Sequence, residues 1–89
     1  MAKVEVTPIL ARHLQVPACE VPGGSVGEVL EALFESHPTL RSYVLEDHGA
    51  LRRHVVIFVN GEVIRDRKTL GDEVTPTCDV VIMQALSGG

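Results

Sequence analysis

Residues 54–64 read HVVIFVNGEVI, and this stretch decides the fold. β-Branched and aromatic side chains crowd its first part, residues 54–59, as is typical of a β-strand. Asn60-Gly61 follows, and this dipeptide favours a two-residue turn in which both residues have positive φ. Residues 62–64 then return as a short partner strand. The stretch therefore predicts a β-hairpin.

Further strands are predicted on both sides of the hairpin. On the C-terminal side, residues 65–77 are polar and indicate a long connection, and residues 79–85 read as the last strand. On the N-terminal side, residues 3–6 alternate between polar and apolar side chains and predict the first strand. Residues 16–21 predict the second strand. The chain therefore carries strands at both ends.

One amphipathic helix is predicted after the second strand. Ser25 and Glu28 match the capping-box pattern, in which Ser25 caps the helix start and the Glu28 side chain reaches back to the Ser25 amide. Apolar residues at helical spacing then form one stripe: Val26, Val29, Leu30, Leu33 and Phe34. His37-Pro38 ends the helix, because the residue before a proline is pushed out of the α region. Residues 40–51 are expected to form a short helix or a pair of turns.

The composition fits one small domain. A chain of 89 residues is too short for a second core, and 45 % apolar with 3 % aromatic content means that aliphatic side chains must fill the first. A net charge of −4 and a pI of about 5.4 argue against a nucleic-acid partner, which needs clustered Lys and Arg. No apolar run has the length of a membrane span or of a secretory signal, so we expect no membrane partner and a cytoplasmic protein.

Metal and redox sites are not predicted. Cys19 and Cys78 are too far apart in sequence for a close-spaced metal or redox pair, so we expect two buried or half-buried thiols. The histidines are dispersed and show no metal-ligand spacing: His13, His37, His48 and His54. Gly23-Gly24 indicates a turn and not a phosphate loop, because no Gly-Lys-Ser/Thr follows it.

The sequence ends in Ser87-Gly88-Gly89, directly after the last predicted strand. A C-terminal glycine carboxylate is an unhindered acyl group, and residues without a Cβ atom can enter a narrow channel. The carboxylate is an anion at neutral pH and therefore a poor electrophile until it is activated. Since no phosphate loop, metal-ligand cluster or nucleophile-base pair is evident in the chain, activation must come from a partner.

A chain of this order that ends in Gly-Gly resembles the MoaD/ThiS family of ubiquitin-like sulfur carriers. The residues that carry the resemblance are Val59-Asn60-Gly61-Glu62, Asp79-Val80-Val81-Ile82 and Ala85-Leu86-Ser87-Gly88-Gly89. The resemblance implies an α+β fold of the β-grasp (ubiquitin-like) type, with a mixed sheet of four to five strands and one main helix on one face. The first and last strands would lie parallel in its centre. Residues 1–86 would form the domain and residues 87–89 a flexible tail.

The chain departs from the family pattern in two places. A Gly-Asp-Glu-Val-like turn usually comes just before the last strand, but here Gly71-Asp72-Glu73-Val74 lies too far upstream and belongs to the long connection. The Pro-rich approach to the tail is replaced by Gln84-Ala85-Leu86. Both departures weaken an assignment to the molybdopterin branch of the family.

The resemblance implies that the protein is a co-substrate and not an enzyme. A ubiquitin-activating-type adenylyltransferase/sulfurtransferase would use ATP and Mg²⁺ to adenylate Gly89, while Leu86, Ser87 and Gly88 lie inside that partner. A sulfur donor would then leave a Gly89 thiocarboxylate for a downstream biosynthetic enzyme, in the formation of cysteine, thiamin or a thio-natural product. The alternatives are a molybdopterin synthase small subunit, a protein modifier conjugated to lysine through Gly89, and an interaction domain with an incidental Gly-Gly end. The chain itself would bind no cofactor or metal.

A docking face for the partner follows from strand alternation. Val55, Ile57 and Val59 point to one side of the sheet, with Val80 and Ile82 as neighbours that face the helix. The opposite side then carries several apolar groups, which suggests a partner surface: Val56, Phe58, Val81 and Met83. His54 falls on the same side. In the alternative, the long connection covers these residues.

Overall fold

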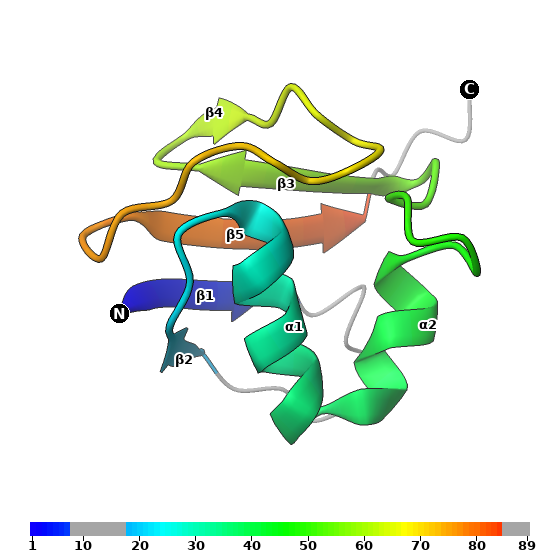
Figure 1. The fold of residues 1–89 in the computed structure, drawn as a ribbon, viewed down its shortest axis with the longest axis horizontal. Helices are drawn as coiled ribbons and strands as arrows, with labels where there is room; N and C mark the ends of the chain where they lie inside the picture. The colour runs from blue at the N-terminus through cyan, green and yellow to red at the C-terminus, as the bar shows by residue number, and fades with distance from the viewer. Residues whose placement is uncertain (8–17, 85–89) are drawn as a thin grey trace.

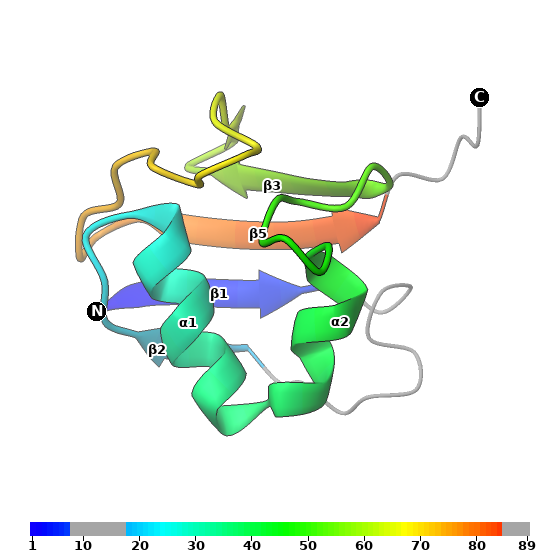
Figure 2. The ribbon, with the colours of Figure 1, turned by 45° about the vertical axis from the view of Figure 1, so that its right-hand side comes forward.

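The computed structural model describes residues 1–7 and 18–84. Its sheet has the strand order β2-β1-β5-β3-β4 (Figure 1). The strands are β1 (Ala2–Val6), β2 (Cys19–Val21), β3 (Val55–Val59), β4 (Glu62–Val63) and β5 (Asp79–Gln84). The helices are α1 (Val26–Ser36), the 3-10 helix η1 (Pro38–Leu40) and α2 (Arg41–Val44). The expected mixed sheet with one main helix is confirmed, and Figure 2 shows α1 and α2 on the same side of it.

The first and last strands lie parallel in the centre of the sheet, as expected. Val4 of β1 is opposite Val80 of β5, and Val6 is opposite Ile82. β3 pairs with the other edge of β5 in the antiparallel sense, with Ile57 opposite Ile82. Because side chains alternate along each strand, these five valines and isoleucines all point at the helices and are buried.

Helix α1 begins where the sequence predicts, with one difference in its cap. The Glu28 amide donates to the Ser25 hydroxyl over 3.2 Å, so Ser25 is the N-cap. The Glu28 carboxylate accepts from the Gly24 amide over 2.7 Å and not from the Ser25 amide. The expected second half of the capping box is therefore displaced by one residue, onto the turn that precedes the helix. The predicted apolar stripe is fully buried against the sheet: Val26, Val29, Leu30, Leu33 and Phe34.

Several element boundaries differ from the sequence prediction by a residue or more. The described part of the second strand begins at Cys19, and residues 16–17 of the predicted strand lie outside the described residues. β5 ends at Gln84, and Ala85 also lies outside them. β4 stops at Val63, although the Ile64 amide still donates to the Ile57 carbonyl over 3.0 Å. The stretch expected to be a short helix or turns contains α2, followed by turns at residues 47–50.

The hairpin between β3 and β4 has the predicted turn. Asn60 has φ 51° and Gly61 has φ 83°, both in the left-handed region. The Asn60 side chain also fastens the turn to the start of β5, because its Oδ1 accepts from the Asp79 amide over 2.8 Å. The Asn60 amide in turn donates to the Asp79 carbonyl over 2.8 Å. The turn therefore connects β3, β4 and the start of β5.

The 65–77 connection runs beside the start of α1. Its Leu70 and Asp72 carbonyls accept from the Gly27 and Val26 amides over 2.8 and 2.9 Å, which satisfies donors that a helix start leaves without intrahelical partners. The Gly71-Asp72-Glu73 sequence is part of this connection, as expected. Although the connection is mostly polar in sequence, its Leu70 side chain is buried in the core.

Two carboxylates organise the same connection. Asp66 accepts from the Thr69 hydroxyl and from the amides of Thr69 (2.9 Å) and Gly71 (3.1 Å). Asp72 accepts from the Arg65 amide over 3.0 Å and the Asp66 amide over 2.8 Å. The hydrogen bond from the Thr69 side chain, followed by the backbone bonds, lowers the pKa of Asp66, and the bond from the Arg65 amide lowers the pKa of Asp72.

In the described part of the chain, no helix is long and apolar enough to cross a membrane.

Candidate functional site

The predicted reacting residue and its neighbours lie beyond the described residues. These are Leu86, Ser87, Gly88 and Gly89, which together with Ala85 follow β5 in sequence. The last described residue, Gln84, is opposite Val55 at the beginning of β3. The chain therefore leaves the sheet from its central strand, at the end where β3 begins (Figure 2).

The four residues of the predicted docking face are brought together by strand pairing. Phe58 is directly opposite Val81, and Val56 is directly opposite Met83. Residues opposite each other share a face, so all four lie on the side of the sheet away from α1. Each is half-buried. The predicted grouping of these side chains is confirmed, while their role in docking stays a prediction.

The structure adds Val63 to this group. Val63 of β4 is opposite Phe58 and therefore shares its face, and 54 % of its surface is exposed. We define the apolar patch as Val56, Phe58, Val63, Val81 and Met83. Sequence reasoning missed Val63 because a two-residue strand has no alternation to follow. The Asn60-Gly61 turn contained the signal, since a two-residue hairpin loop sets which residues pair across it.

The alternative in which the 65–77 connection covers the patch is wrong. The connection is hydrogen-bonded to the start of α1, through Gly27 to Leu70 and through Val74 to the Gly24 carbonyl over 3.0 Å. It therefore lies on the helix side of the sheet, and Figure 1 shows it passing in front of β3 on that side. The patch faces the other way.

Charged residues border the patch at the end of the sheet far from the tail. Lys3 of β1 is opposite both Glu20 of β2 and Asp79 of β5, so the three form one row. Glu5 is the neighbour of Val81 in the next row. The face thus changes along β5 from charged at Asp79 to apolar at Met83, where the tail begins. An apolar centre with a charged border is the usual composition of a protein interface.

A pocket opens at the end of β5, beside Gln84. We call it the tail-root pocket, and its lining residues are Ser42, Tyr43, Glu46, Arg52, Arg53, His54, Val55 and Gln84. Three of these carry or can carry positive charge, and they lie next to each other in sequence. Sequence reasoning placed only His54 near the docking face, because the turn that brings α2 beside Gln84 has no sequence signature.

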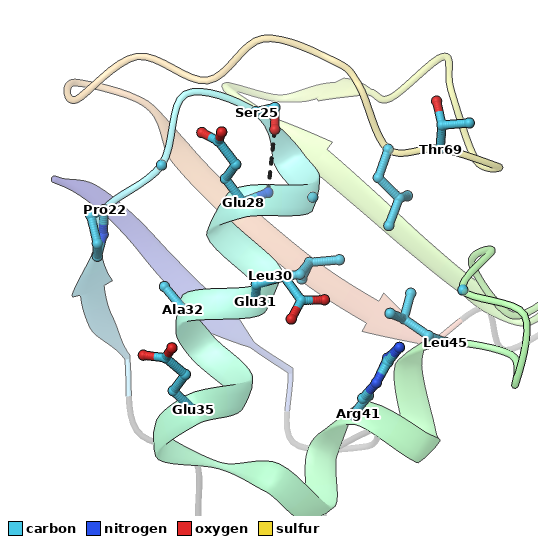
Figure 3. A pocket seen from close by; sticks show the side chains of 14 residues that line it. Pro22, Ser25, Glu28, Leu30, Glu31, Ala32, Glu35, Arg41, Leu45 and Thr69 are labelled. Carbon is cyan, nitrogen blue, oxygen red and sulfur yellow. Dashed lines mark hydrogen bonds between the residues drawn. The ribbon is translucent and has the colours of Figure 1, made fainter.

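A second groove follows α1 on the helix side (Figure 3). Glu28, Glu31 and Glu35 project from successive turns of α1, while Arg41 comes from the start of α2. Leu45 and Leu70 line the same groove and belong to the core. This groove lies on the other side of the sheet from the apolar patch.

The two thiols are half-buried or buried, as the sequence predicts. Cys19 is half-buried, and Cys78 is buried with its sulfur 3.3 Å from the Thr75 amide and 3.5 Å from the Asn60 side-chain nitrogen. His13 lies outside the described residues. Among residues 1–7 and 18–84, no group of three or more His, Cys, Asp or Glu side chains is arranged to hold a metal ion.

Comparison with known proteins identifies relatives in sequence. The model of the ThiS family matches residues 15–89. Small archaeal modifier protein 1 of Haloferax volcanii is 34 % identical over 65 residues, which cover 73 % of this chain and 70 % of that relative.

Solved structures confirm the fold. A chain of the Amycolatopsis orientalis BexX/CysO complex superposes with a TM-score of 0.84 at 24 % identity, with 100 % of both chains covered. Small archaeal modifier protein 1 of Haloferax volcanii gives a TM-score of 0.75 at 29 % identity, over 99 % of this chain and 98 % of that one. These neighbours are β-grasp, ubiquitin-like proteins, so the predicted β-grasp fold is confirmed.

Proposed function

Because the chain belongs to the ThiS family, whose relatives found here are small modifiers or carriers and not catalysts, we propose that it is a sulfur carrier that reacts at Gly89. A ubiquitin-activating-type adenylyltransferase activates the Gly89 carboxylate. A sulfur donor converts it to a thiocarboxylate, and a downstream biosynthetic enzyme takes the sulfur. The protein acts in the cytoplasm as a co-substrate of these enzymes.

The observation that supports this proposal is that the match to the ThiS family runs through Gly88 and Gly89, which follow the central strand β5 in sequence. The central strand β5 ends at Gln84, and residues 85–89 follow it with Gly88-Gly89 last. Five residues in an extended chain reach roughly 17 Å at about 3.3 to 3.6 Å per residue. That length is enough to place a carboxylate inside another protein while the sheet stays outside it.

The chemistry divides between the chain and its partner. A Gly89 carboxylate oxygen attacks the α-phosphorus of ATP and pyrophosphate leaves, so that an acyl-adenylate forms. A sulfur nucleophile then attacks the Gly89 carbonyl carbon and AMP leaves with the bonding electron pair. The partner supplies ATP, Mg²⁺ and the sulfur donor. This chain supplies the unhindered acyl group and the surfaces that place it.

The apolar patch supplies the first of these surfaces. Phe58 lies between Val81 and Val63 in the pairing of three strands, which puts the largest side chain of the patch near its middle. Central aromatic side chains dominate the free energy of many protein interfaces. In this proposal, the patch docks on an apolar surface of the activating enzyme while residues 86–88 occupy its channel.

Conjugation to proteins is the second candidate function. It is favoured by the relative of 34 % identity, which is named as a protein modifier. In that case a lysine amine attacks the activated Gly89 carbonyl, and an isopeptide bond forms in place of the thiocarboxylate.

The mass of the intact protein tests the proposal. The chain is incubated with the activating enzyme of its source cell, ATP, Mg²⁺ and a sulfide donor, and is compared with a variant that ends at Gly88. We expect a sulfur-for-oxygen mass increase at the C-terminus of the full chain and none in the variant. Gly-Gly remnants on lysine without a thiocarboxylate would select the modifier, and full turnover of the shortened variant would refute a role for Gly89.

A further inference from the structure

The tail-root pocket lies at the end of β5, after which the tail follows in sequence. Gln84 belongs to its lining, and the next residue in sequence is the first of the five that lead to Gly89. Val55, opposite Gln84, connects this end of the sheet to Arg53 and His54 directly before it. Figure 2 shows α2 and the turn before β3 beside the end of β5. The pocket is therefore built from three separate parts of the chain.

The wall of this pocket is held in place by hydrogen bonds. Arg52 Nε donates to the Ser42 carbonyl over 2.6 Å, and Arg52 Nη1 lies 3.6 Å from Glu46 Oε2. Arg67 Nη2, from the 65–77 connection, donates to the Arg52 carbonyl over 2.7 Å. The Arg52 amide also donates to the Val44 carbonyl over 3.0 Å. A surface fixed in this way binds a partner with little loss of conformational entropy.

Not every charged side chain of the pocket forms an ion pair with another described residue. Arg52 and Glu46 form an ion pair with each other, so they contribute little net charge. Arg53 and His54 are exposed, and the Arg53 guanidinium forms no salt bridge within residues 1–7 and 18–84. Tyr43, whose surface is 42 % exposed, adds an aromatic ring with a hydroxyl group. Arg53 therefore gives this surface at the end of β5 a positive charge, although the net charge of the protein is −4.

Geometry requires that the activating enzyme come close to this pocket. An enzyme that acts on Gly89 must bring its active site within roughly 17 Å of Gln84, because the five intervening residues extend no further. The rim of its channel therefore approaches the surface around Gln84. Gln84 lines the pocket, so the pocket lies within reach of that rim.

We propose that the tail-root pocket is a second docking site for the activating enzyme, in which Arg53 binds a carboxylate side chain at the rim of the enzyme's channel. Arg53 is a specificity-determining residue in this arrangement and takes no part in the chemistry at Gly89. The inference rests on the proposed function, because it assumes an enzyme that encloses the tail. Guanidinium–carboxylate pairing is directional and discriminates partners through both charge and geometry.

Charge reversal at Arg53 tests the inference. ATP–pyrophosphate exchange is measured with the activating enzyme of the source cell at varied concentrations of the carrier, for the unaltered chain and for Arg53→Glu. We expect KM for the carrier to rise about ten-fold with kcat changed by less than about two-fold, because the lost contact serves association. The difference in KM should shrink when the salt concentration rises from about 0.05 M to about 0.3 M.

Arg65→Glu is the matched control. Arg65 is exposed and lies near Val59, at the far end of β3 from Val55, together with Glu62, Asp72 and Glu73. Its substitution by Glu changes the net charge by the same amount as Arg53→Glu. We expect its KM to stay within about two-fold of the unaltered chain. If either reversal impairs folding, as judged by urea unfolding, the pair Arg53→Gln and Arg65→Gln replaces it with a proportionately smaller effect.

The outcomes separate this inference from the proposed function. An equal KM for Arg53→Glu and Arg65→Glu, with normal exchange by the unaltered chain, would overturn the inference alone. A lower KM for Arg53→Glu would also overturn it, because Arg53 would then weaken association with the enzyme. Absence of exchange with the unaltered chain would refute the proposed function itself.

Discussion

Phe58 is the single residue on which the docking proposal depends most. Its ring is half-buried between Val81 and Val63, so it contributes to the sheet and remains available to a partner. A residue with this double role can affect folding and binding separately. The two effects must therefore be measured in the same variant.

We expect Phe58→Asp to weaken binding of the activating enzyme by about 2 kcal/mol, or roughly thirty-fold in Kd, because a central aromatic contact is replaced by a charge that must be desolvated. Isothermal titration calorimetry against the enzyme measures this loss. Phe58→Leu keeps an apolar side chain and should lose much less.

Val63→Asp is the companion variant, since its more exposed position makes it less harmful to folding. Affinities unchanged in both Asp variants would show that the patch is not an interface.

At the scale of elements, the 65–77 connection follows the hairpin and is hydrogen-bonded to the start of α1. Its carboxylates Asp66 and Asp72 accept backbone amides inside the connection, and its carbonyls accept the first amides of α1. Because hydrogen bonds lower the pKa of Asp66, its folded-state pKa lies below the ordinary value of 3.8. The carboxylate therefore stabilises the fold at pH values above about 4, and this stabilisation is lost as the pH falls through the folded-state pKa.

We expect Asp66→Asn to unfold at a lower urea concentration than the unaltered chain at pH 7, because an amide cannot accept the same set of donors. The difference should narrow as the pH is lowered from about 4 towards 2, because the Asp66 carboxylate is protonated in the unfolded state over this range while it stays ionised in the folded state. Urea unfolding followed by circular dichroism at several pH values measures both effects.

Asp47→Asn removes the same charge from an exposed turn, where the carboxylate accepts no hydrogen bond from the described residues. A difference that stays constant over this pH range, or an equal one for Asp47→Asn, would contradict the assignment to Asp66.

At the scale of the whole molecule, we expect the domain and Gly89, the proposed reacting residue, to be separate parts. The buried apolar residues of the described chain extend from Ala2 to Ile82, so the described part of the core ends before the last residues of β5. The described strand pairs end at Gln84, and the helices and the 65–77 connection come before it in the chain. We therefore expect that the core does not depend on Gly88 and Gly89.

A variant that ends at Leu86 should therefore unfold at the same urea concentration as the full chain, with a change in unfolding free energy of less than about 0.5 kcal/mol. The same variant should give no acyl-adenylate in the exchange assay, because its C-terminal carboxylate, on Leu86, lies three residues short of the position of Gly89. A loss of stability above about 1 kcal/mol would show that the tail is part of the fold.

Local patterns in the chain were enough to predict most of the elements. Helix α1 followed from the Ser25 cap and from apolar spacing, and the hairpin followed from Asn60-Gly61, because these signals act over a few neighbouring residues. Strand alternation also predicted which side chains of β3 and β5 face the helices. Boundaries were less accurate at β2 and β4, since strands this short have almost no periodicity of their own.

By itself, the sequence determined helix α1, the hairpin and four of the five residues of the apolar patch, because alternation, caps and turns are local properties, while the β-grasp fold was predicted from the family resemblance. Only the tertiary structure decided that Val63 joins the patch, that the 65–77 connection lies on the helix side, and that Arg53 sits beside Gln84. Each of these depends on contacts between residues far apart in sequence. Such contacts form only when the strands pair and the core closes, so no local pattern records them.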